Sequence, residues 1–419
     1  MRAFAKPIIA SAPPSCSVLP PFSGHDRIHF FYHNTKGYPM PSPHAAAETL
    51  TVSVVIPSYR GGNGLVELVR GLLNCNARPL EVIVIIDDPD REALNGLLTE
   101  FSDPSVKVFL REGRQGKVSA LNEALKLVRG DVVLFLDDDV RVNDPKFIDK
   151  VAEAMKSCDL LDVKKVIVGK GLLAKLVYIE YTAYNFASKM MAKLAGRAIA
   201  INGAAFAVKR RALDEIGYFK PCLAEDLDFA LRSFVKGCRF SFLDSTYVLN
   251  YAPSSWTHWL KQRKRWAVGL ASWLRENYRV LLRAVREVPH VIIPGIILTL
   301  PSLLTMIVAL ALHGMLSKKA TYAALLPLSS LIRELIPVTA AVSISLIMMY
   351  TVTTLAFAFL LLSLGVLQYV IAKVTGLKPY AHLIPVYLLF YQTVWLTILS
   401  VGLIRVLIFG DERVEDWVV

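Results

Sequence analysis

The segment VVLFLDDD (residues 132–139) joins a run of five apolar residues to three consecutive aspartates. The apolar run predicts a buried strand, and the aspartates would then lie at the edge of its sheet as oxygen ligands for a divalent cation. Side chains alternate along a strand, so Asp137 and Asp139 are expected to point one way and Asp138 the other. The alternative is a solvated acidic turn, because turns favour aspartate.

The sequence around this segment alternates short apolar runs with helical patterns. We expect strands at 51–57, 81–87, 106–110 and 131–137, and helices at 64–74, 91–101 and 119–128. Strands that are apolar on both faces and separated by helices predict a parallel sheet covered on both sides. Ligands of such sheets bind beyond the carboxyl ends of the strands, where PSYR (57–60), Asp87-Asp88 and the aspartate triplet are expected to lie.

The composition predicts two kinds of domain. Of the 419 residues 54% are apolar, and the excess is concentrated in the last third of the chain. We expect a disordered tail at 1–48, an α/β domain at 49–250, basic amphipathic interface helices at 251–287, a transmembrane domain of three or four spans at 288–409 and a short tail at 410–419. Met40 is an alternative start to Met1. A helix at 170–197 would lie on the membrane surface or pack on the domain.

Basic residues are concentrated just before the apolar region. The net charge is +12, and residues 251–290 contain eight Lys or Arg against two Glu. Such flanking charge marks the cytoplasmic side of a membrane and attracts anionic headgroups. We therefore expect a multi-pass plasma-membrane protein with a cytoplasmic catalytic domain and lipid partners, rather than a nucleic-acid-binding protein. The five cysteines form no CxxC pair, so neither a zinc site nor a disulfide framework is indicated.

Four motifs in order resemble those of the family 2 inverting glycosyltransferases, in particular the membrane-embedded polysaccharide synthases and the ceramide glucosyltransferases. They are VVIPSY (54–59) with IIDDPD (85–90), REGRQGKVSALNEAL (111–125), the aspartate triplet, and LAEDLDFALR (223–232) with QRKRW (262–266). The resemblance covers about residues 50–275. It implies a GT-A fold, a Rossmann-like domain with a mostly parallel sheet, followed by an α-helical transmembrane domain.

The resemblance assigns residues to a nucleotide-sugar donor and a metal. The expected donor-binding residues are Pro57, Tyr59, Asp87, Asp88, Lys117, Asp137 and Asp138. Asp137 and Asp139 would hold Mg²⁺ or Mn²⁺. Tyr59 offers a stacking face and Lys117 a point charge for a phosphate. Pro89 departs from the family pattern, which leaves open which aspartate contacts the base. The alternatives are an ordinary strand end and a solvated basic loop.

The resemblance also assigns a catalytic base and its neighbours. Asp226 would take the proton of the acceptor hydroxyl, supported by Glu225, Gln262, Arg265, Trp266 and Gly203. Ala224 stands where the family often has threonine. The alternatives are an exposed helix start for Glu225-Asp226, a β-hairpin core around Gly203 and a basic amphipathic helix for QRKRW.

Together these patterns predict transfer of a sugar from a nucleotide diphosphate sugar, a UDP-hexose or UDP-N-acetylhexosamine, to a growing β-linked polysaccharide. Transfer of one sugar to a lipid acceptor is the alternative. The alternative that is not an enzyme is a transport or scaffold protein whose nucleotide-binding domain is catalytically inactive.

Overall fold

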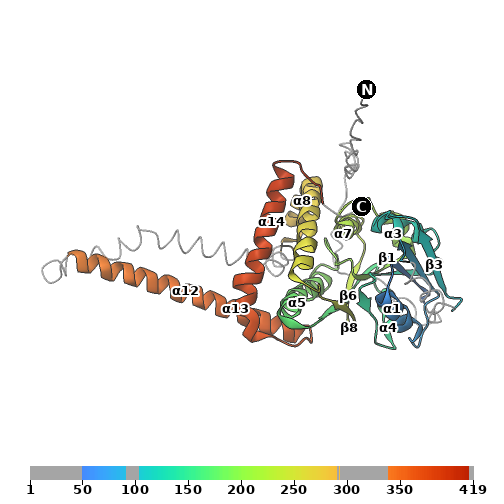
Figure 1. The fold of residues 1–419 in the computed structure, drawn as a ribbon, viewed down its shortest axis with the longest axis horizontal. Helices are drawn as coiled ribbons and strands as arrows, with labels where there is room; N and C mark the ends of the chain where they lie inside the picture. The colour runs from blue at the N-terminus through green and yellow to red at the C-terminus, as the bar shows by residue number, and fades with distance from the viewer. Residues whose placement is uncertain (1–49, 91–102, 290–291, 293–337, 415–419) are drawn as a thin grey trace, which may run out of the picture.

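The computed structural model describes residues 50–90, 103–289, 292 and 338–414 (Figure 1). The expected tail at 1–48, with both possible starts, lies outside the described residues. So do the whole of the expected helix at 91–101, nearly all of the apolar stretch at 288–312, and residues 415–419 of the expected C-terminal tail.

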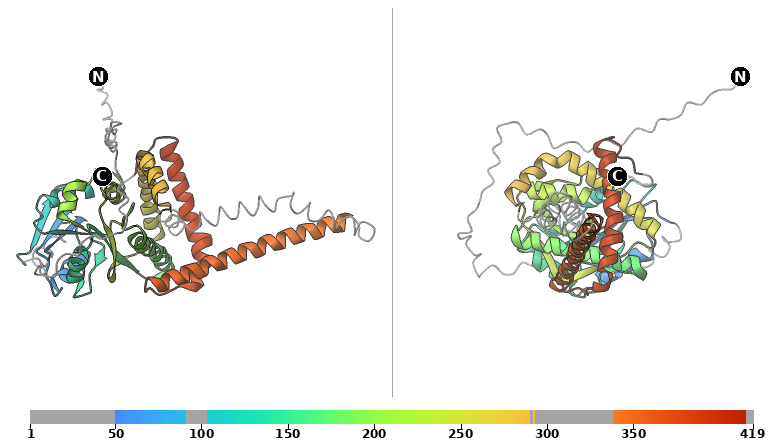
Figure 2. Two further views of the ribbon diagram at one scale, coloured as in Figure 1. Left: turned by 180° about the vertical axis from the view of Figure 1, so that it is seen from behind. Right: turned by 90° about the vertical axis from the view of Figure 1, so that its left-hand side faces the viewer.

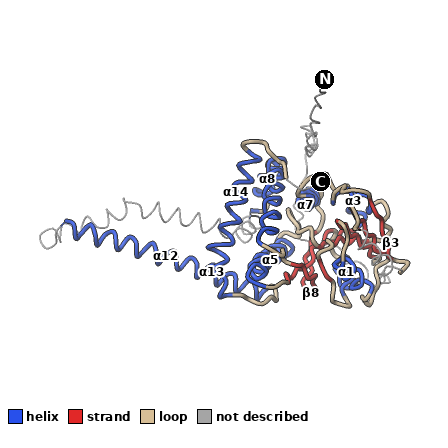
Figure 3. Tube along the Cα trace, in the orientation of Figure 1, coloured by secondary structure: helices blue, strands red, loops and turns tan. Residues whose placement is uncertain are grey.

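A mixed sheet forms the centre of the α/β domain, with the strand order β3-β2-β1-β4-β7-β6-β8-β5 (Figure 3). The parallel half confirms the expected strands: β1 (Val52–Tyr59), β2 (Glu81–Asp87), β3 (Val106–Arg111) and β4 (Val132–Leu136). The sheet is mixed: four of its seven strand pairs are parallel, as expected of a mostly parallel sheet, but β7 (Ala205–Lys209) runs antiparallel to both β4 and β6 (Leu160–Val168). β6 pairs parallel with β8 (Phe240–Tyr251), and β5 (Val140–Arg141) pairs antiparallel with β8.

Alternation along the strands sends apolar side chains into two separate cores. Val54 and Ile56 of β1 pack beneath α1 (Asn63–Leu73) and α4 (Phe147–Met155). Val55 faces the opposite layer, formed by α3 (Lys117–Leu125), α6 (Arg210–Ile216) and α7 (Glu225–Val235). The sheet is thus covered on both faces, as the apolar strands predicted. The residues around 201–213 form no hairpin, because β7 is a central strand followed by α6.

Three long helices lie beside this domain. α5 (Gly171–Leu194) packs on β6 and also against α12 (Val338–Val374), so it is a packed helix with many buried residues. α8 is one continuous helix, Trp256–Glu287, rather than several interface helices, and it lies along α14 (Gln392–Leu407). Figures 1 and 2 show α12 extending away from the sheet domain. Short turns η1 (Ala381–Leu383), α13 (Ile384–Val386) and η2 (Tyr387–Tyr391) join α12 to α14.

Two segments of the described chain are long and apolar enough to cross a membrane, Phe357–Val374 and Ala381–Leu407. Only 22% and 39% of their most apolar stretches are buried within the protein. A core helix of a soluble protein would be mostly buried, so these segments differ from one.

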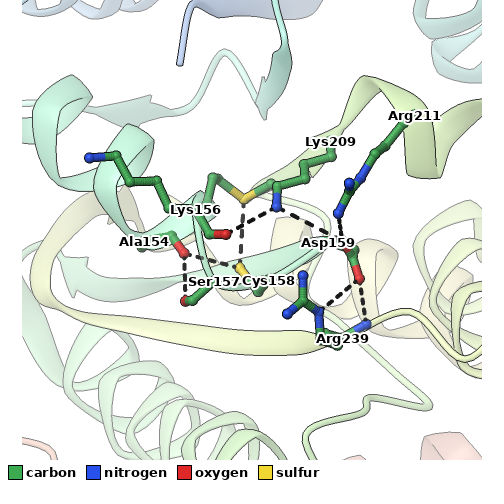
Figure 4. Close-up of polar contacts among 9 residues, drawn as sticks. Ala154, Lys156, Ser157, Cys158, Asp159, Lys209, Arg211 and Arg239 are labelled. Atoms are coloured by element: carbon green, nitrogen blue, oxygen red, sulfur yellow. Dashed lines mark hydrogen bonds and ion pairs between the residues drawn. The ribbon is translucent and has the colours of Figure 1, made fainter. Parts of the chain in front are cut away.

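Asp159 lies at the amino end of β6, at the other edge of the sheet from the aspartate triplet, and forms ion pairs with the segments that follow β7 and precede β8 (Figure 4). Its carboxylate lies 3.1 Å from Arg211, 3.4 Å from Arg239 and 4.0 Å from Lys209. The neighbouring Cys158 is buried, and this burial raises the pKa of its thiol to about 12. Cys158 is therefore an inert packing residue and not a nucleophile.

Candidate functional site

A cavity lies at the carboxyl end of β4, where the sequence predicted ligand binding. Its lining combines the ends of β1 and β4 with the starts of α3 and α7: Pro57, Lys117, Leu121, Phe135, Leu136, Asp137, Gly203, Phe206, Phe219, Glu225 and Asp226. Six of the predicted site residues therefore share one cavity, although they come from five separate segments of the chain.

Lys117 joins the two acidic segments of this cavity. Its ammonium nitrogen lies 2.7 Å from Asp137 Oδ1 and 3.1 Å from Glu225 Oε1. Burial opposes the charged form of Lys117, but the carboxylates of Asp137 and Glu225 outweigh it and hold its pKa above the ordinary value. Lys117 begins α3, directly after Gly116, whose φ of 94° suits glycine. A permanently positive side chain thus stands between the aspartate triplet and the predicted base.

Asp226 is held at the start of α7 by two backbone donors. The Gly203 N–H donates to Oδ2 at 2.9 Å, and the Leu227 N–H donates to Oδ1 at 2.8 Å. Burial and then the charge of Glu225 raise its pKa to about 6, against the opposing effect of Lys117. A half-buried carboxylate with a pKa just below neutrality is ionised at pH 7 and can still accept a proton, as a general base must.

Gly203 lies so close to Asp226 that a side chain would not fit between them. A Cβ atom at this position would lie 2.9 Å from Asp226 Oδ2 and 3.1 Å from its Cβ. Such contacts are closer than van der Waals packing allows, so any side chain here must displace Asp226.

We expect Gly203→Ala to lower kcat by about 10²-fold, because a shift of about 1 Å in a reacting group costs that much. Donor affinity should change little, since the displaced group faces the acceptor's proton. Steady-state kinetics with the donor and acceptor measure both. Gly365→Ala is the matched control, because its added Cβ would meet only an ordinary 3.6 Å contact. An unchanged kcat in Gly203→Ala would contradict the proposed position of the base.

Arg265 lies within electrostatic reach of the same carboxylates. The charges of Glu225, Asp137 and Asp226 favour its protonated form, while burial, the larger effect, lowers its pKa. The structure therefore brings the basic motif of α8 to the aspartate triplet and Asp226. Gln262 and Trp266 are half-buried on the same helix, and the Trp266 ring lies 4.2 Å from the guanidinium carbon of Arg263.

β4 ends at Leu136, and Asp138 and Asp139 form a turn, so the alternation expected of a strand does not extend through the triplet. Asp137 turns to Lys117, whereas Asp138 accepts a hydrogen bond from Ser58 at 2.5 Å. Although Asp139 is exposed, the protein around it limits the hydration of its carboxylate. This desolvation, followed by the charges of Asp137 and Asp138, raises its pKa to about 7. The triplet thus carries more negative charge than its surroundings stabilise.

A divalent cation fits this set of ligands in part. Carboxylate oxygens are the ligands that Mg²⁺ and Mn²⁺ prefer, and a cation would relieve the repulsion at Asp139. Within the described residues, however, no three acidic, His or Cys side chains are grouped closely enough to hold an ion by themselves. A cation here would need further oxygens from a bound ligand, which is how Mg²⁺ commonly joins one or two carboxylates to phosphates.

Tyr59 and Asp88 lie at the exposed edge of β1 and β2. The Arg114 guanidinium carbon lies 4.5 Å from the centre of the Tyr59 ring, and the Tyr59 hydroxyl is 3.4 Å from Asp88. Asp88 and Arg60 adopt positive φ angles of 47° and 67°, the only two non-glycine residues to do so in the described chain. Strained backbone of this kind is concentrated at functional sites.

Asp87 differs from its prediction. It is buried, and its carboxylate accepts hydrogen bonds from Arg111 Nε (2.6 Å) and from the N–H groups of Gln115 (2.9 Å) and Gly116 (2.8 Å). Because these donors occupy its oxygens, Asp87 anchors the loop before Lys117 rather than offering a free carboxylate to a base. Arg111, its partner, was not among the predicted residues. It could have been predicted, because β3 ends in Arg111 beside the end of β2, which carries Asp87.

A buried ionic cluster on α8 was also missed. Arg263 is fully buried and paired with Glu180 of α5, while the Tyr391 hydroxyl donates to Glu180 (2.8 Å) and accepts from Arg263 (3.0 Å). The indole rings of Trp266, Trp395 and Trp259 surround the guanidinium at 4.2, 5.2 and 5.5 Å. Helical spacing of Trp259, Arg263 and Trp266 could have indicated that this arginine faces inward.

Comparison with known proteins identifies the class to which this fold and site belong. The family model described as Glycosyltransferase like family 2 matches residues 49–269, more than half of the chain. The protein therefore belongs to this family and is a glycosyltransferase, and its mixed α/β sheet is that of a GT-A domain.

Two relatives illustrate the match. A probable glycosyltransferase YdaM of Bacillus subtilis (strain 168) is 25% identical over 235 residues, which cover 52% of this chain and 54% of the relative. Poly-beta-1,6-N-acetyl-D-glucosamine synthase of Staphylococcus epidermidis is 25% identical over 245 residues, 55% of this chain and 56% of the relative. The chain thus spans about half the length of the curated relatives that it matches.

Two solved structures are also similar. The mannosyltransferase PcManGT from Pyrobaculum calidifontis, in complex with GDP-Man and Mn²⁺, is 18% identical with a TM-score of 0.44, covering 75% of this chain and 86% of that one. TarS 1-349 from S. aureus, in complex with UDP-GlcNAc, is 19% identical with a TM-score of 0.39, covering 54% and 67%.

Proposed function

We propose that this protein is a membrane-bound inverting glycosyltransferase that moves a hexose or N-acetylhexosamine from a UDP-sugar to a growing β-linked polysaccharide. The observation that carries the proposal is the single cavity that joins Asp137, Lys117, Glu225 and Asp226, with Arg265 in electrostatic reach. The similarity to the poly-beta-1,6-N-acetyl-D-glucosamine synthase of Staphylococcus epidermidis supports an N-acetylhexosamine and a polymeric product.

The residues divide the chemistry between them. Asp226 takes the proton of the acceptor hydroxyl as its oxygen bonds to the anomeric carbon. The bond from that carbon to the diphosphate oxygen breaks on the opposite face, so the configuration inverts. Lys117 and Arg265 are the positive groups placed to meet the negative charge of the departing nucleoside diphosphate. Tyr59, Asp88 and Pro57 would hold the nucleoside at the edge of β1 and β2.

Asp137 and Asp139 would hold the Mg²⁺ or Mn²⁺ together with the donor's diphosphate. A bound cation neutralises the phosphate oxygens as charge develops on the leaving group. Asp138, already bonded to Ser58, would position the loop that carries the two ligands.

The location follows from the helices. Phe357–Val374 of α12 would be one of several spans, with the catalytic domain, the basic face of α8 and the α14 helix packed along it on the cytoplasmic side of the plasma membrane. The acceptor would then be a glycan close to the membrane surface.

The deciding experiment supplies the purified full chain in lipid with a panel of UDP- and GDP-sugars and identifies products by mass spectrometry. A polymer of one sugar would support the proposal. A lipid carrying a single sugar would favour glycolipid synthesis instead. Failure of every donor to release nucleoside diphosphate, in folded protein with Mn²⁺, would favour the inactive transport or scaffold protein.

Asp139→Ala should abolish the dependence of donor binding on Mn²⁺ and weaken that binding by about 10²-fold, since a metal-bridged diphosphate is stabilised by several kcal/mol. Calorimetric titration of the UDP-sugar with and without Mn²⁺ measures both effects. Asp149→Ala, an exposed aspartate on α4, is the control that loses the same charge elsewhere. Equal Mn²⁺ dependence in Asp139→Ala and wild type would exclude Asp139 as a ligand.

A further inference from the structure

A second cavity lies between α5, the last turns of α12 and η1, and it shares no residue with the first. Its lining is largely aromatic and polar: Tyr178, Ile179, Thr182, Gln368, Tyr369, Ala372, Lys378, Pro379, Tyr380, Ala381 and Ile384. The empty space is about 260 Å³, part of it open to solvent. The enclosed part has room for about one water-sized group, so it suits a single hydroxyl of a molecule bound at the mouth rather than a nucleotide sugar.

Gln368 gives this cavity an unused hydrogen-bond acceptor. Only 5% of its surface is exposed, and its Oε1 atom has no hydrogen-bond partner among the described residues. Buried amide oxygens are almost always paired, and an unpaired one is destabilising. An O–H or N–H donor on a bound molecule would supply the missing partner.

Three lysines make the rim of this cavity positive. Lys175 and Lys378 lie 5.9 and 5.8 Å from the centre of the Tyr380 ring, and Lys373 lies 5.8 Å from that of Tyr369. All three lysines are exposed, so their charges are available to an anion at the mouth. A phosphate is the anion that suits clustered lysines beside tyrosines.

The walls of the cavity are held in place by hydrogen bonds across it. The Tyr178 hydroxyl accepts from the backbone N–H of Lys378 at 2.9 Å, and Lys189 donates to the carbonyl oxygen of Val374 at 3.2 Å. Lys164 donates to the neighbouring carbonyl of Thr375. The end of α12 is therefore fixed on the α/β domain before any ligand arrives.

The outer face of α12 continues from the cavity as an exposed apolar surface. It includes Phe359, Leu362, Val366, Leu367 and Val370. Acyl chains would cover such a face, and a headgroup attached to them would then lie at the end of the helix, where the lysines are.

We propose that this cavity binds the headgroup of an anionic phospholipid that carries a free hydroxyl, with the phosphate at the lysines and the hydroxyl donating to Gln368 Oε1. The inference rests on the proposed membrane location but not on the proposed reaction. It adds to the protein a lipid site that is separate from the catalytic cavity.

The test measures lipid binding to the full chain in detergent, by displacement of a fluorescent phospholipid. The probes are phosphatidylglycerol, which has phosphate and hydroxyls, phosphatidylethanol, which has the same singly charged phosphodiester but no hydroxyl, and phosphatidylcholine, which has no net charge. Free sn-glycerol 1-phosphate is the fourth probe. We expect phosphatidylglycerol to bind about five-fold more tightly than phosphatidylethanol, the effect of one hydrogen bond, and phosphatidylcholine to bind weakly.

Two variants separate the contribution of the Gln368 acceptor from that of the lysine charge. Gln368→Met keeps the length of the side chain but removes the acceptor, so it should abolish the preference for phosphatidylglycerol while affinity for phosphatidylethanol is unchanged. Lys378→Gln should weaken both anionic lipids alike. Arg279→Gln, on the exposed face of α8, removes the same charge away from the cavity and should preserve the preference.

Sugar-transfer assays distinguish this site from the catalytic one. Binding that is normal in an inactive Asp226→Asn protein would support the lipid site independently of the reaction. Equal affinity for phosphatidylglycerol and phosphatidylethanol in the wild type, or an undiminished preference in Gln368→Met, would overturn the proposal. Competition by sn-glycerol 1-phosphate as strong as that by the lipid would show that the ligand is a free phosphate ester and would also overturn it.

Discussion

Asp226→Asn is expected to lower kcat by about 10³- to 10⁴-fold, the upper part of the range for loss of a general base, while donor affinity stays within about two-fold of the wild type. Asparagine keeps the shape of the side chain, and its amide oxygen can still accept from the Gly203 N–H or the Leu227 N–H. What it loses is the ability to take a proton. Single-turnover transfer and equilibrium donor binding, measured on the same preparation, separate the two effects.

Asp214→Asn is the matched control for this variant. Asp214 is an exposed aspartate on α6, so its loss should leave both kcat and donor affinity unchanged. Turnover of Asp226→Asn near the wild-type rate would remove Asp226 from the mechanism.

The same assignment predicts a pH profile. A base must be ionised, and the pKa of Asp226 is raised to about 6, so the rate of transfer should rise tenfold per pH unit below about pH 6 and level off above it. The effect of pH on the free energy of unfolding has the opposite sign. A carboxyl whose folded pKa is raised favours the folded state more as pH falls from about 6 towards its ordinary value of 3.8. A rate that is flat between pH 5 and 7 would contradict the assignment.

Arg263→Met is expected to destabilise the protein by about 3–5 kcal/mol, because it leaves the carboxylate of Glu180 buried without its counter-charge. Both side chains are fully buried, and only the neutral hydroxyls of Tyr391 and Tyr184 are seen to donate to Glu180 besides Arg263 in the described chain. The midpoint of thermal unfolding should fall by about 10 °C, as measured by fluorescence in detergent.

The double variant Glu180→Leu with Arg263→Met tests the reason for this loss. Replacing both charges by apolar groups of similar size removes the unpaired carboxylate, so most of the lost stability should return. Arg279→Met, on the exposed face of α8, should change the midpoint by less than about 1–2 °C. A double variant as unstable as Arg263→Met would show that packing of the arginine stem, not its charge, is what stabilises the cluster.

This cluster also links the catalytic domain to the apolar helices. Arg263 lies between Gln262 and Arg265 in the same motif, and its guanidinium lies against the Trp266 ring. Glu180 belongs to α5, whereas Tyr391 and Trp395 belong to η2 and α14. The position of Arg265 near the site, and that of Trp266 against Arg263, therefore depend on contacts with helices more than a hundred residues further along the chain.

The first half of the α/β domain could be predicted because its signals are local. Val54, Val55 and Ile56 are apolar in succession, and the helix that follows has the spacing of a half-buried helix. The direction of β7 could not be predicted, because a short apolar strand pairs equally well in either direction until its neighbours are known.

The sequence by itself determined the α/β order of the domain, the position of the aspartates at the end of a strand and the chemical character of the site, because these depend on neighbouring residues and on the period of the strand. Only the tertiary structure decided which charged groups pair. It joined Lys117 to Glu225, withdrew Asp87 into a loop anchor and buried Arg263 rather than Arg265. Such choices depend on groups far apart in the chain, whose pairing energies arise only after packing has removed water from between them.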